Sequence, residues 1–331
     1  MKRGIYFILL TTVILMNISS CDAVSGRNSS VDPIHINRFD KDLYQLITLD
    51  TPELQEKIAT DYPDMLKAFG LGVFRMQDIQ NPDFFDRLVN YYSEPALNQL
   101  YQEALKAFST IETVEADLSA GFHCLKTCFP AMQIPAVYMH VSGLQQNVLV
   151  DDSLLSISID KYMGADYPLY QDYFYEYQLR KMTPDRIVPD YLKAWLLSEY
   201  PFTGNDRVLL EQMIYEGKIQ YIIHQALPKV LPEILMGYSS SDYQWCKQNE
   251  KIVWNSIIER KHLFTSDAAT TRRYFSEMPS VFISDEAPGD LGRWIGWQIV
   301  TNYMKRTNSS VEYLMMNVDY QEILTKSRYK P

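Results

Sequence analysis

The chain has 331 residues, of which 47% are hydrophobic and 13% aromatic, and its formal net charge at pH 7 is -10. This composition is typical of a packed globular body and excludes a largely disordered protein. An acidic chain repels phosphate backbones, and the sequence has no basic stripe with interleaved aromatic residues. We therefore expect no nucleic-acid partner.

The N-terminus has the pattern of a secretory signal. Lys2 and Arg3 precede an apolar segment at residues 5–18, which is too short to span a membrane comfortably. The segment ends in Ile-Ser-Ser-Cys at residues 18–21, which resembles a bacterial lipobox. The resemblance implies cleavage before Cys21 and acylation of its thiol and amine. An ordinary secretory signal with a chance cysteine is the alternative.

Three segments follow from this interpretation. We predict a lipoprotein signal peptide at residues 1–20, an acylated Cys21 with a flexible polar tether at 21–33, and a single domain at 34–331. A multiply acylated terminus anchors a protein stably, because one acyl chain alone binds a membrane only marginally. The tether lacks an acidic run, which favours a protein that faces the periplasm.

The first part of the domain is predicted to be mainly helical. Residues 34–43 have the pattern of a short strand followed by a helix, and a helical pattern with proline-marked breaks covers residues 51–118. Strand signals are confined to residues 135–160, where the run at 155–159 alternates apolar and polar residues. We therefore predict an α+β fold, mostly α-helical, with a small antiparallel sheet near residues 135–160 and an added strand from the start of the domain.

Tyrosines at every second or third position mark the segment that follows the sheet, from Tyr167 to Tyr177. Tyrosine is often half-buried at the edge of a core, and we favour that interpretation. A stacking platform for sugars is the alternative. Later helices are predicted at residues 189–200, 209–224, 243–261, 267–277 and 288–305.

The helix at residues 209–224 is apolar nearly all round, which is typical of a buried helix. Asn205 and Asp206 are its expected caps. The residues expected on its narrow solvated strip are Glu211, Lys218 and Gln225.

Glu216 projects from the apolar sector of this helix. A buried carboxylate costs several kcal/mol unless it is paired, ligated or protonated. Gly217 follows it, at a cost of about 1 kcal/mol relative to alanine in a helix interior. The pair indicates either a functional site or a structural ion pair at a close helix crossing, and chemistry alone favours the second. Glu216 is the one weak catalytic candidate.

The last long helix has Gly292 and Gly296 one turn apart, with Arg293 beside them. Glycines on one helix face allow another backbone to approach closely. We predict that this helix packs on the central one, and that Arg293 or Lys218 neutralises Glu216. A separation of more than about 8 Å would exclude that neutralisation.

Established catalytic motifs are missing from the sequence. Zinc hydrolases of the usual helical type need His-Glu-x-x-His, but no two of the five histidines are three or four residues apart. The sequence has no Gly-x-Ser-x-Gly elbow, P-loop or dinucleotide-binding glycine motif. We therefore expect no metal site, no cofactor and, on balance, no enzymatic activity.

Several stretches in order resemble the gliding motility lipoprotein GldB family. They are Glu-Gln-Met-Ile-Tyr-Glu-Gly-Lys at 211–218, Trp-Cys-Lys-Gln-Asn-Glu at 245–250 and Gly-Arg-Trp-Ile-Gly-Trp-Gln-Ile-Val at 292–300, with Ile-Asn-Arg-Phe-Asp at 36–40 and Ser-Arg-Tyr-Lys-Pro at 327–331. The resemblance covers nearly the whole mature chain. It implies an outer-membrane lipoprotein needed for gliding. In this kind of gliding, motility is coupled to protein secretion across the outer membrane. It carries over no catalytic residues.

A more distant resemblance concerns the fold. Glu216-Gly217 and the helix with Gly292 and Gly296 are similar to a predicted zinc-protease family, in which a Glu-Gly helix supplies the third metal ligand. This chain has the glutamate and lacks both histidines of that site. The resemblance implies a degenerate zincin-like domain.

Three functions compete at this point. The first is a non-catalytic, lipid-anchored scaffold with protein partners in the cell envelope, for which Trp294 or Trp297 would be exposed as a contact. The second is an envelope hydrolase that uses Glu216 as general acid or base, since burial can raise the pKa of a carboxylic acid. The third is a glycan-binding lipoprotein that uses the aromatic segment from Tyr167 to Tyr177.

Overall fold

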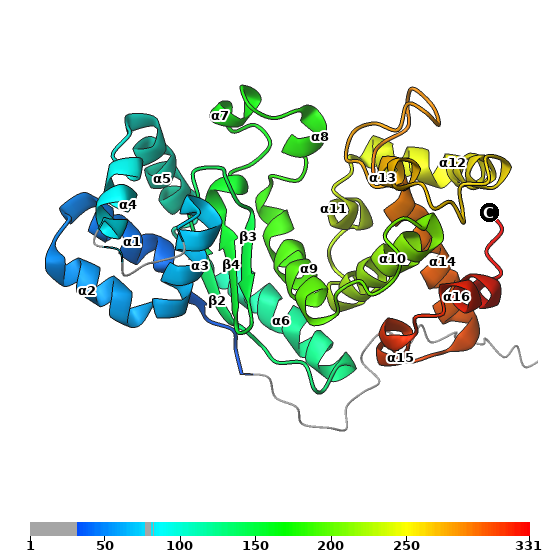
Figure 1. The fold of residues 1–331 in the computed structure, drawn as a ribbon, viewed down its shortest axis with the longest axis horizontal. Helices are drawn as coiled ribbons and strands as arrows, with labels where there is room; N and C mark the ends of the chain where they lie inside the picture. Colours follow the sequence, from blue (N-terminus) through cyan, green and yellow to red (C-terminus); the bar gives the residue numbers. More distant parts are fainter. Residues whose placement is uncertain (1–31, 77–80, 82) are drawn as a thin grey trace, which may run out of the picture. The chain divides into compact units, whose positions relative to one another are not determined.

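A small sheet lies between two groups of helices in the computed structural model (Figure 1). The structure describes residues 32–76, 81 and 83–331. The predicted signal peptide, Cys21 and nearly all of the tether therefore lie outside the described residues. The predicted segment boundaries near residues 20 and 33 stay predictions.

Six helices separate the first strand from the rest of the sheet in the described chain. They are α1 (Phe39–Leu49), α2 (Pro52–Asp61), α3 (Pro63–Phe74), α4 (Phe84–Tyr92), α5 (Pro95–Ala107) and α6 (Glu112–Cys128). Proline occupies the first turn of α2, α3 and α5, where its missing N–H costs no hydrogen bond. The helical character predicted for residues 51–118 is confirmed, although the last part is divided between α5 and α6.

The sheet is mixed rather than antiparallel. Its strands are β1 (Ile36–Asn37), β2 (Ala136–His140), β3 (Val148–Asp151) and β4 (Leu154–Ser158), in the spatial order β1-β2-β4-β3. β2 pairs in parallel with both β1 and β4, and only β3 pairs antiparallel to β4. The predicted position of the sheet and its added first strand are confirmed, but the prediction of an antiparallel sheet holds only for the pair β3 and β4.

Burial explains this arrangement. Every residue of β4 is buried, as expected for a central strand covered on both faces, whereas β3 has exposed residues and lies at the edge. Helices α1 and α3 contact the sheet from one side and α9 from the other (Figure 1). The alternating serines of β4 are therefore buried polar groups; Ser156 Oγ, for example, lies 2.7 Å from Nδ1 of His140.

The remaining elements lie beyond the sheet in the sequence. They are η2 (Ile159–Lys161), α7 (Pro168–Gln171), α8 (Glu176–Leu179), η3 (Pro184–Arg186), α9 (Ile187–Glu199), α10 (Leu209–Ala226), α11 (Pro232–Met236), α12 (Ser240–Glu259), α13 (Ala268–Tyr274), α14 (Leu291–Thr307), α15 (Val311–Met316) and α16 (Tyr320–Ser327). Within the described part of the chain, no helix combines the length and hydropathy needed to cross a membrane.

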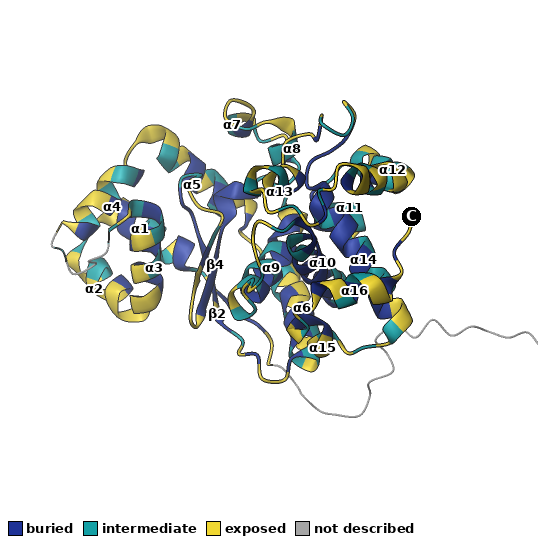
Figure 2. Cartoon of the chain, turned by 45° about the vertical axis from the view of Figure 1, so that its right-hand side comes forward, coloured by how far each residue is buried: buried dark blue, intermediate teal, exposed yellow. Residues whose placement is uncertain are grey.

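Helices α10 and α14 pack against each other along much of their lengths, and most of their residues are buried (Figure 2). Two glycines set the closest approach. A Cβ on Gly217 would lie 2.2 Å from the carbonyl carbon of Gly296, and a Cβ on Gly296 would lie 1.7 Å from the carbonyl oxygen of Met213. The predicted packing of these two helices is confirmed.

Two details of α10 differ from the prediction. Val208 is its N-cap residue, so the predicted caps Asn205 and Asp206 are wrong. Valine has no side-chain acceptor, and the backbone N–H of Leu210 donates to the carbonyl oxygen of Leu263 instead. The expected solvated strip is covered at one of its three positions, since Lys218 is 1% exposed beneath the chain segment that joins α15 to α16, while Glu211 and Gln225 are partly exposed. At both the start of the helix and Lys218, contacts with distant parts of the chain decide the structure, and the local sequence pattern does not.

Gly296→Ala should lower the free energy of unfolding by about 3 kcal/mol or more, because the clash is with backbone that cannot rotate away. Urea denaturation measures the change. Lys305→Ala, at an exposed position of the same helix, is the matched control and should change stability by less than about 0.5 kcal/mol. Equal effects of the two substitutions would contradict the close crossing.

Candidate functional site

Two cationic side chains share one oxygen of Glu216. Its Oε2 lies 3.1 Å from Nε of Arg293 on α14 and 3.6 Å from Nζ of Lys193 on α9. The three side chains are 17–24% exposed, so the cluster is mostly removed from water. The prediction that Arg293 neutralises Glu216 is confirmed.

The cluster continues as a chain of alternating charges. Nη1 of Arg293 lies 3.1 Å from Oδ2 of Asp290, and the same oxygen lies 3.2 Å from Nζ of Lys181. Lys181 in turn lies 2.9 Å from Glu277. Asp290 is buried just before α14, so the ion pairs tie that helix to α9, α10 and the segment after α8.

The charges decide the protonation state of Glu216. Burial alone would raise the pKa of this carboxyl group, but the cations of Lys193 and Arg293 outweigh burial and hold the pKa below its ordinary value of 4.5. The pKa of Lys193 is lowered by burial and by the neighbouring Arg293. A carboxylate held ionised in this way is a poor general acid at neutral pH.

Lys218, the other predicted partner of Glu216, contacts a different part of the fold. Its Nζ donates to the carbonyl oxygens of Asn317, at 2.5 Å, and Met315, at 3.5 Å, and lies over the ring of Tyr320. Burial lowers the pKa of this ammonium group to about 8. The prediction is therefore wrong for Lys218, which caps the carbonyl end of α15.

The two tryptophans predicted as exposed partner contacts are packing residues. Trp294 is 2% exposed and its ring lies 5.3 Å from that of Tyr243, while Trp297 is 6% exposed and lies 5.3 Å from the ring of His224. Both rings lie on helix α14, which is enclosed by α10, α12 and α16. The expected exposure is wrong, because this helix has no solvent-facing side at these positions.

Gly292 does not take part in the crossing of α10 and α14. A Cβ on it would meet the ring of Phe275 at 2.8 Å and the carbonyl oxygen of Tyr274 at 3.0 Å. It therefore allows the end of α13 to approach α14. The two glycines of the last helix serve two different neighbours.

The aromatic segment between Tyr167 and Tyr177 contains both buried and exposed rings. Tyr170 is fully buried and donates to a backbone carbonyl oxygen, and the hydroxyl group of Tyr167 donates to Glu103 at 2.6 Å. Tyr173 and Tyr175 are 69% and 71% exposed. The first half of the segment is thus structural, and the second half faces solvent.

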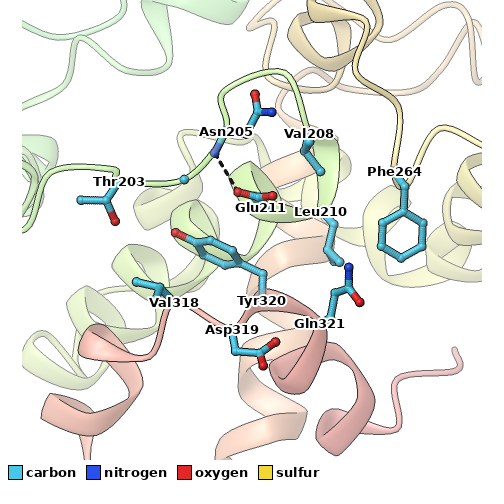
Figure 3. Close-up of a pocket in the computed structure, with 11 residues that line it drawn as sticks. Thr203, Asn205, Val208, Leu210, Glu211, Phe264, Val318, Asp319, Tyr320 and Gln321 are labelled. Carbon is cyan, nitrogen blue, oxygen red and sulfur yellow. Dashed lines mark hydrogen bonds between the residues drawn. The ribbon is translucent and has the colours of Figure 1, made fainter.

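The first cavity to consider, with a volume of about 580 Å³, lies at the N-terminus of α10 and beside α16 (Figure 3). Its two carboxylates serve the backbone: Glu211 accepts from the N–H of Asn205 at 2.7 Å, and Asp319 caps α16. None of the site residues predicted from the sequence lines this cavity. Among residues 32–76, 81 and 83–331, no group of three or more His, Cys, Asp or Glu residues is placed to hold a metal ion.

Comparison with protein families gives a match over residues 22–331 to the family described as gliding motility protein GldB. The chain belongs to the GldB family. The match covers the ion-pair cluster and the whole described part of the chain. Comparisons of this GldB family member with curated proteins and with solved structures give no match.

The predicted zincin-like domain is not supported. No solved structure matches this GldB protein. The distant resemblance implies that the carboxylate of Glu216 binds a metal, but in this structure it pairs with Lys193 and Arg293. The α+β class remains, with mostly helices and a small sheet. The glutamate is therefore explained by its ion pairs.

Sequence reasoning missed Lys193 and Asp290. Lys193 lies on a helix whose neighbouring positions, including Leu192 and Trp195, are fully buried. A lone lysine in such an apolar helix was the available signal for a buried ion-pair partner. Asp290 had a weaker signal, as an acid three residues before Arg293 at a helix start.

Glu216→Gln should lower the free energy of unfolding at neutral pH by about 3 kcal/mol, because it leaves the buried Lys193 without its counter-ion and leaves Arg293 with Asp290 alone. Since the pKa of Glu216 is lowered in the folded state, this stabilisation is present above about pH 4.5 and is lost as the pH falls through the folded-state value. Urea denaturation of both proteins across this range tests it. The exposed Glu259→Gln is the control, and an equal cost for both would contradict the ion pairs.

Lys218→Met should change how stability depends on pH. The folded-state pKa of about 8 lies below the ordinary 10.5, so the unfolded chain binds more protons between these values and the native protein gains stability as the pH rises. The wild type should gain about 2 kcal/mol relative to Lys218→Met between about pH 8 and pH 10. A difference that does not vary with pH would show that the ammonium group is not desolvated.

Proposed function

We propose that this GldB family member is a non-catalytic lipoprotein, anchored through Cys21 in the outer membrane and facing the periplasm, which supports gliding motility and the secretion linked to it. The family match supports the role in motility. The lipobox-like sequence before Cys21 supports the anchor. The partners we propose are the membrane and proteins of the cell envelope.

One observation carries the non-catalytic part of the proposal: Glu216 is bound by two cations on the same oxygen. A general acid needs a proton at the operating pH, and the lowered pKa of Glu216 removes it. A general base near neutral pH needs a pKa closer to that range. The arrangement suits a fold determinant, and this counts against an envelope hydrolase centred on Glu216.

Complementation of a deletion strain separates the two functions. Glu216→Gln should restore gliding at low temperature, where the variant is mostly folded, and should lose it on warming in step with the amount of folded protein. A hydrolase would lose function at every temperature, including those at which folded variant is abundant. Colony spreading measures gliding, and immunoblots measure the amount of folded protein at each temperature.

Cys21→Ser should abolish incorporation of labelled palmitate and move the protein from the membrane fraction to the soluble periplasmic fraction. Serine offers no thiol for acylation, so the lipid anchor on this residue is not formed. Ser20→Ala keeps a small residue before the cysteine and is the matched control. A Cys21→Ser protein that stays labelled and membrane-bound would contradict the anchor.

A further inference from the structure

A second cavity, of about 310 Å³, lies beside the ion-pair cluster and has an unusual charge for this acidic protein. Seven charged side chains line it, and five of them are cationic. The cations are Lys161, Lys181, Arg186, Lys193 and Arg293. They come from η2, the segment after α8, η3, α9 and α14, so the fold brings them together from five places in the sequence.

Only half of the counter-ions of these side chains line the cavity. Asp190, which pairs with Arg186, and Glu277, which pairs with Lys181, are in its wall, whereas Glu216 and Asp290 pair with Arg293 and do not line it. The inner surface is therefore cationic, although the cluster as a whole is close to neutral. Such a surface attracts anions, and low-dielectric walls strengthen the attraction.

Donor groups at this surface are left without a strong acceptor. Lys193 makes one ion pair, at 3.6 Å, and no hydrogen bond to any described residue. Lys161 is 8% exposed, and its Nζ has only the carbonyl oxygen of Leu144, at 3.3 Å, and the ring of Phe174. A bound anion would give these two ammonium groups a charged acceptor at hydrogen-bonding distance, which neither has in the described chain.

The rest of the wall is mixed, with the polar Asn147, Tyr162 and Gln178 beside several apolar side chains. Val148, Phe174, Met182 and Leu197 line the same cavity. A pocket with apolar side chains in its wall and a few convergent charged donors is typical of a site for a small organic ligand. The volume fits a molecule of a few carbon atoms with one or two anionic groups.

We propose that this cavity binds a small organic oxyanion, a carboxylate or phosphate, which contacts Lys193 and Lys161 and lies against the apolar part of the wall. The binding requires no catalysis and does not depend on the proposed anchor. Lys193 then has two partners, since it contacts Glu216 on one side and the ligand on the other. Binding of the anion would raise the free energy of unfolding, because a ligand that binds only the folded chain stabilises it.

Isothermal titration calorimetry of the full-length protein in detergent, with citrate and with inorganic phosphate as probes at low ionic strength, tests the site. We expect saturable one-site binding of at least one probe, weakened about tenfold or more by Lys193→Met. Lys161→Met should have the same effect, and it serves as the test if Lys193→Met does not fold, because Lys161 takes no part in the pairing of Glu216.

Lys305→Met, an exposed lysine of α14 outside the cavity, is the matched control and should bind as the wild type does. Binding of citrate alone assigns the site to carboxylates, and binding of phosphate alone assigns it to phosphates. The proposal is overturned if neither probe binds saturably at millimolar concentration. It is also overturned if all three lysine variants bind equally well, because the anions would then be held by surface charge in general.

Discussion

The close crossing of α10 and α14 sets the geometry on which the rest of the C-terminal half depends. Gly217 and Gly296 let the two backbones approach to a distance that no side chain would permit. Because the helices are so close, Arg293 can reach Glu216 across the interface, and α9 can add Lys193 to the same carboxylate. The two helical glycines and the buried acid each cost stability. The close crossing and the ion pairs that it allows offset both costs.

This solution also shapes what the protein can do. An ionised glutamate between two cations has no free proton and little basicity, so the conspicuous carboxylate of the sequence is a poor catalytic group. The charges that neutralise it, however, contribute to a cationic cavity surface along α9 and at the start of α14. The cluster thus joins the packing of the helices to a strongly basic cavity wall, which we propose as a binding site.

Much of the fold was predictable because local patterns and tertiary structure agree. Proline-started helices, the position of the strands and the close approach of α10 to α14 at Gly296 all appear where the sequence places them. The pairing of the strands was not predictable from alternation, because the serines of β4 are buried and hydrogen-bonded rather than solvated. A pattern of period two shows that a strand has two faces, and it does not show what covers each face.

The site was predictable only in part for the same reason. Glu216, Gly217, Arg293 and Gly296 stand out because each breaks a local rule of helix composition. Lys218 was expected on the solvated strip of its helix, but it donates to carbonyl oxygens at the end of α15. That helix lies about a hundred residues further along the chain and gives no signal near position 218. The burial of Trp294 and Trp297 likewise depends on α10, α12 and α16, which pack around α14 from different parts of the sequence.

The central claim is that Glu216 is a structural counter-ion, and a double-mutant cycle between Glu216→Gln and Arg293→Met tests it most directly. The free energy of unfolding of the wild type, both single variants and the double variant gives the coupling between the two side chains. The account predicts a favourable coupling of about 1.5 kcal/mol or more, because each single variant leaves the other charge without its main partner. Costs that add to within about 0.5 kcal/mol would contradict it, since Glu216 would then have been retained for something other than its ion pair.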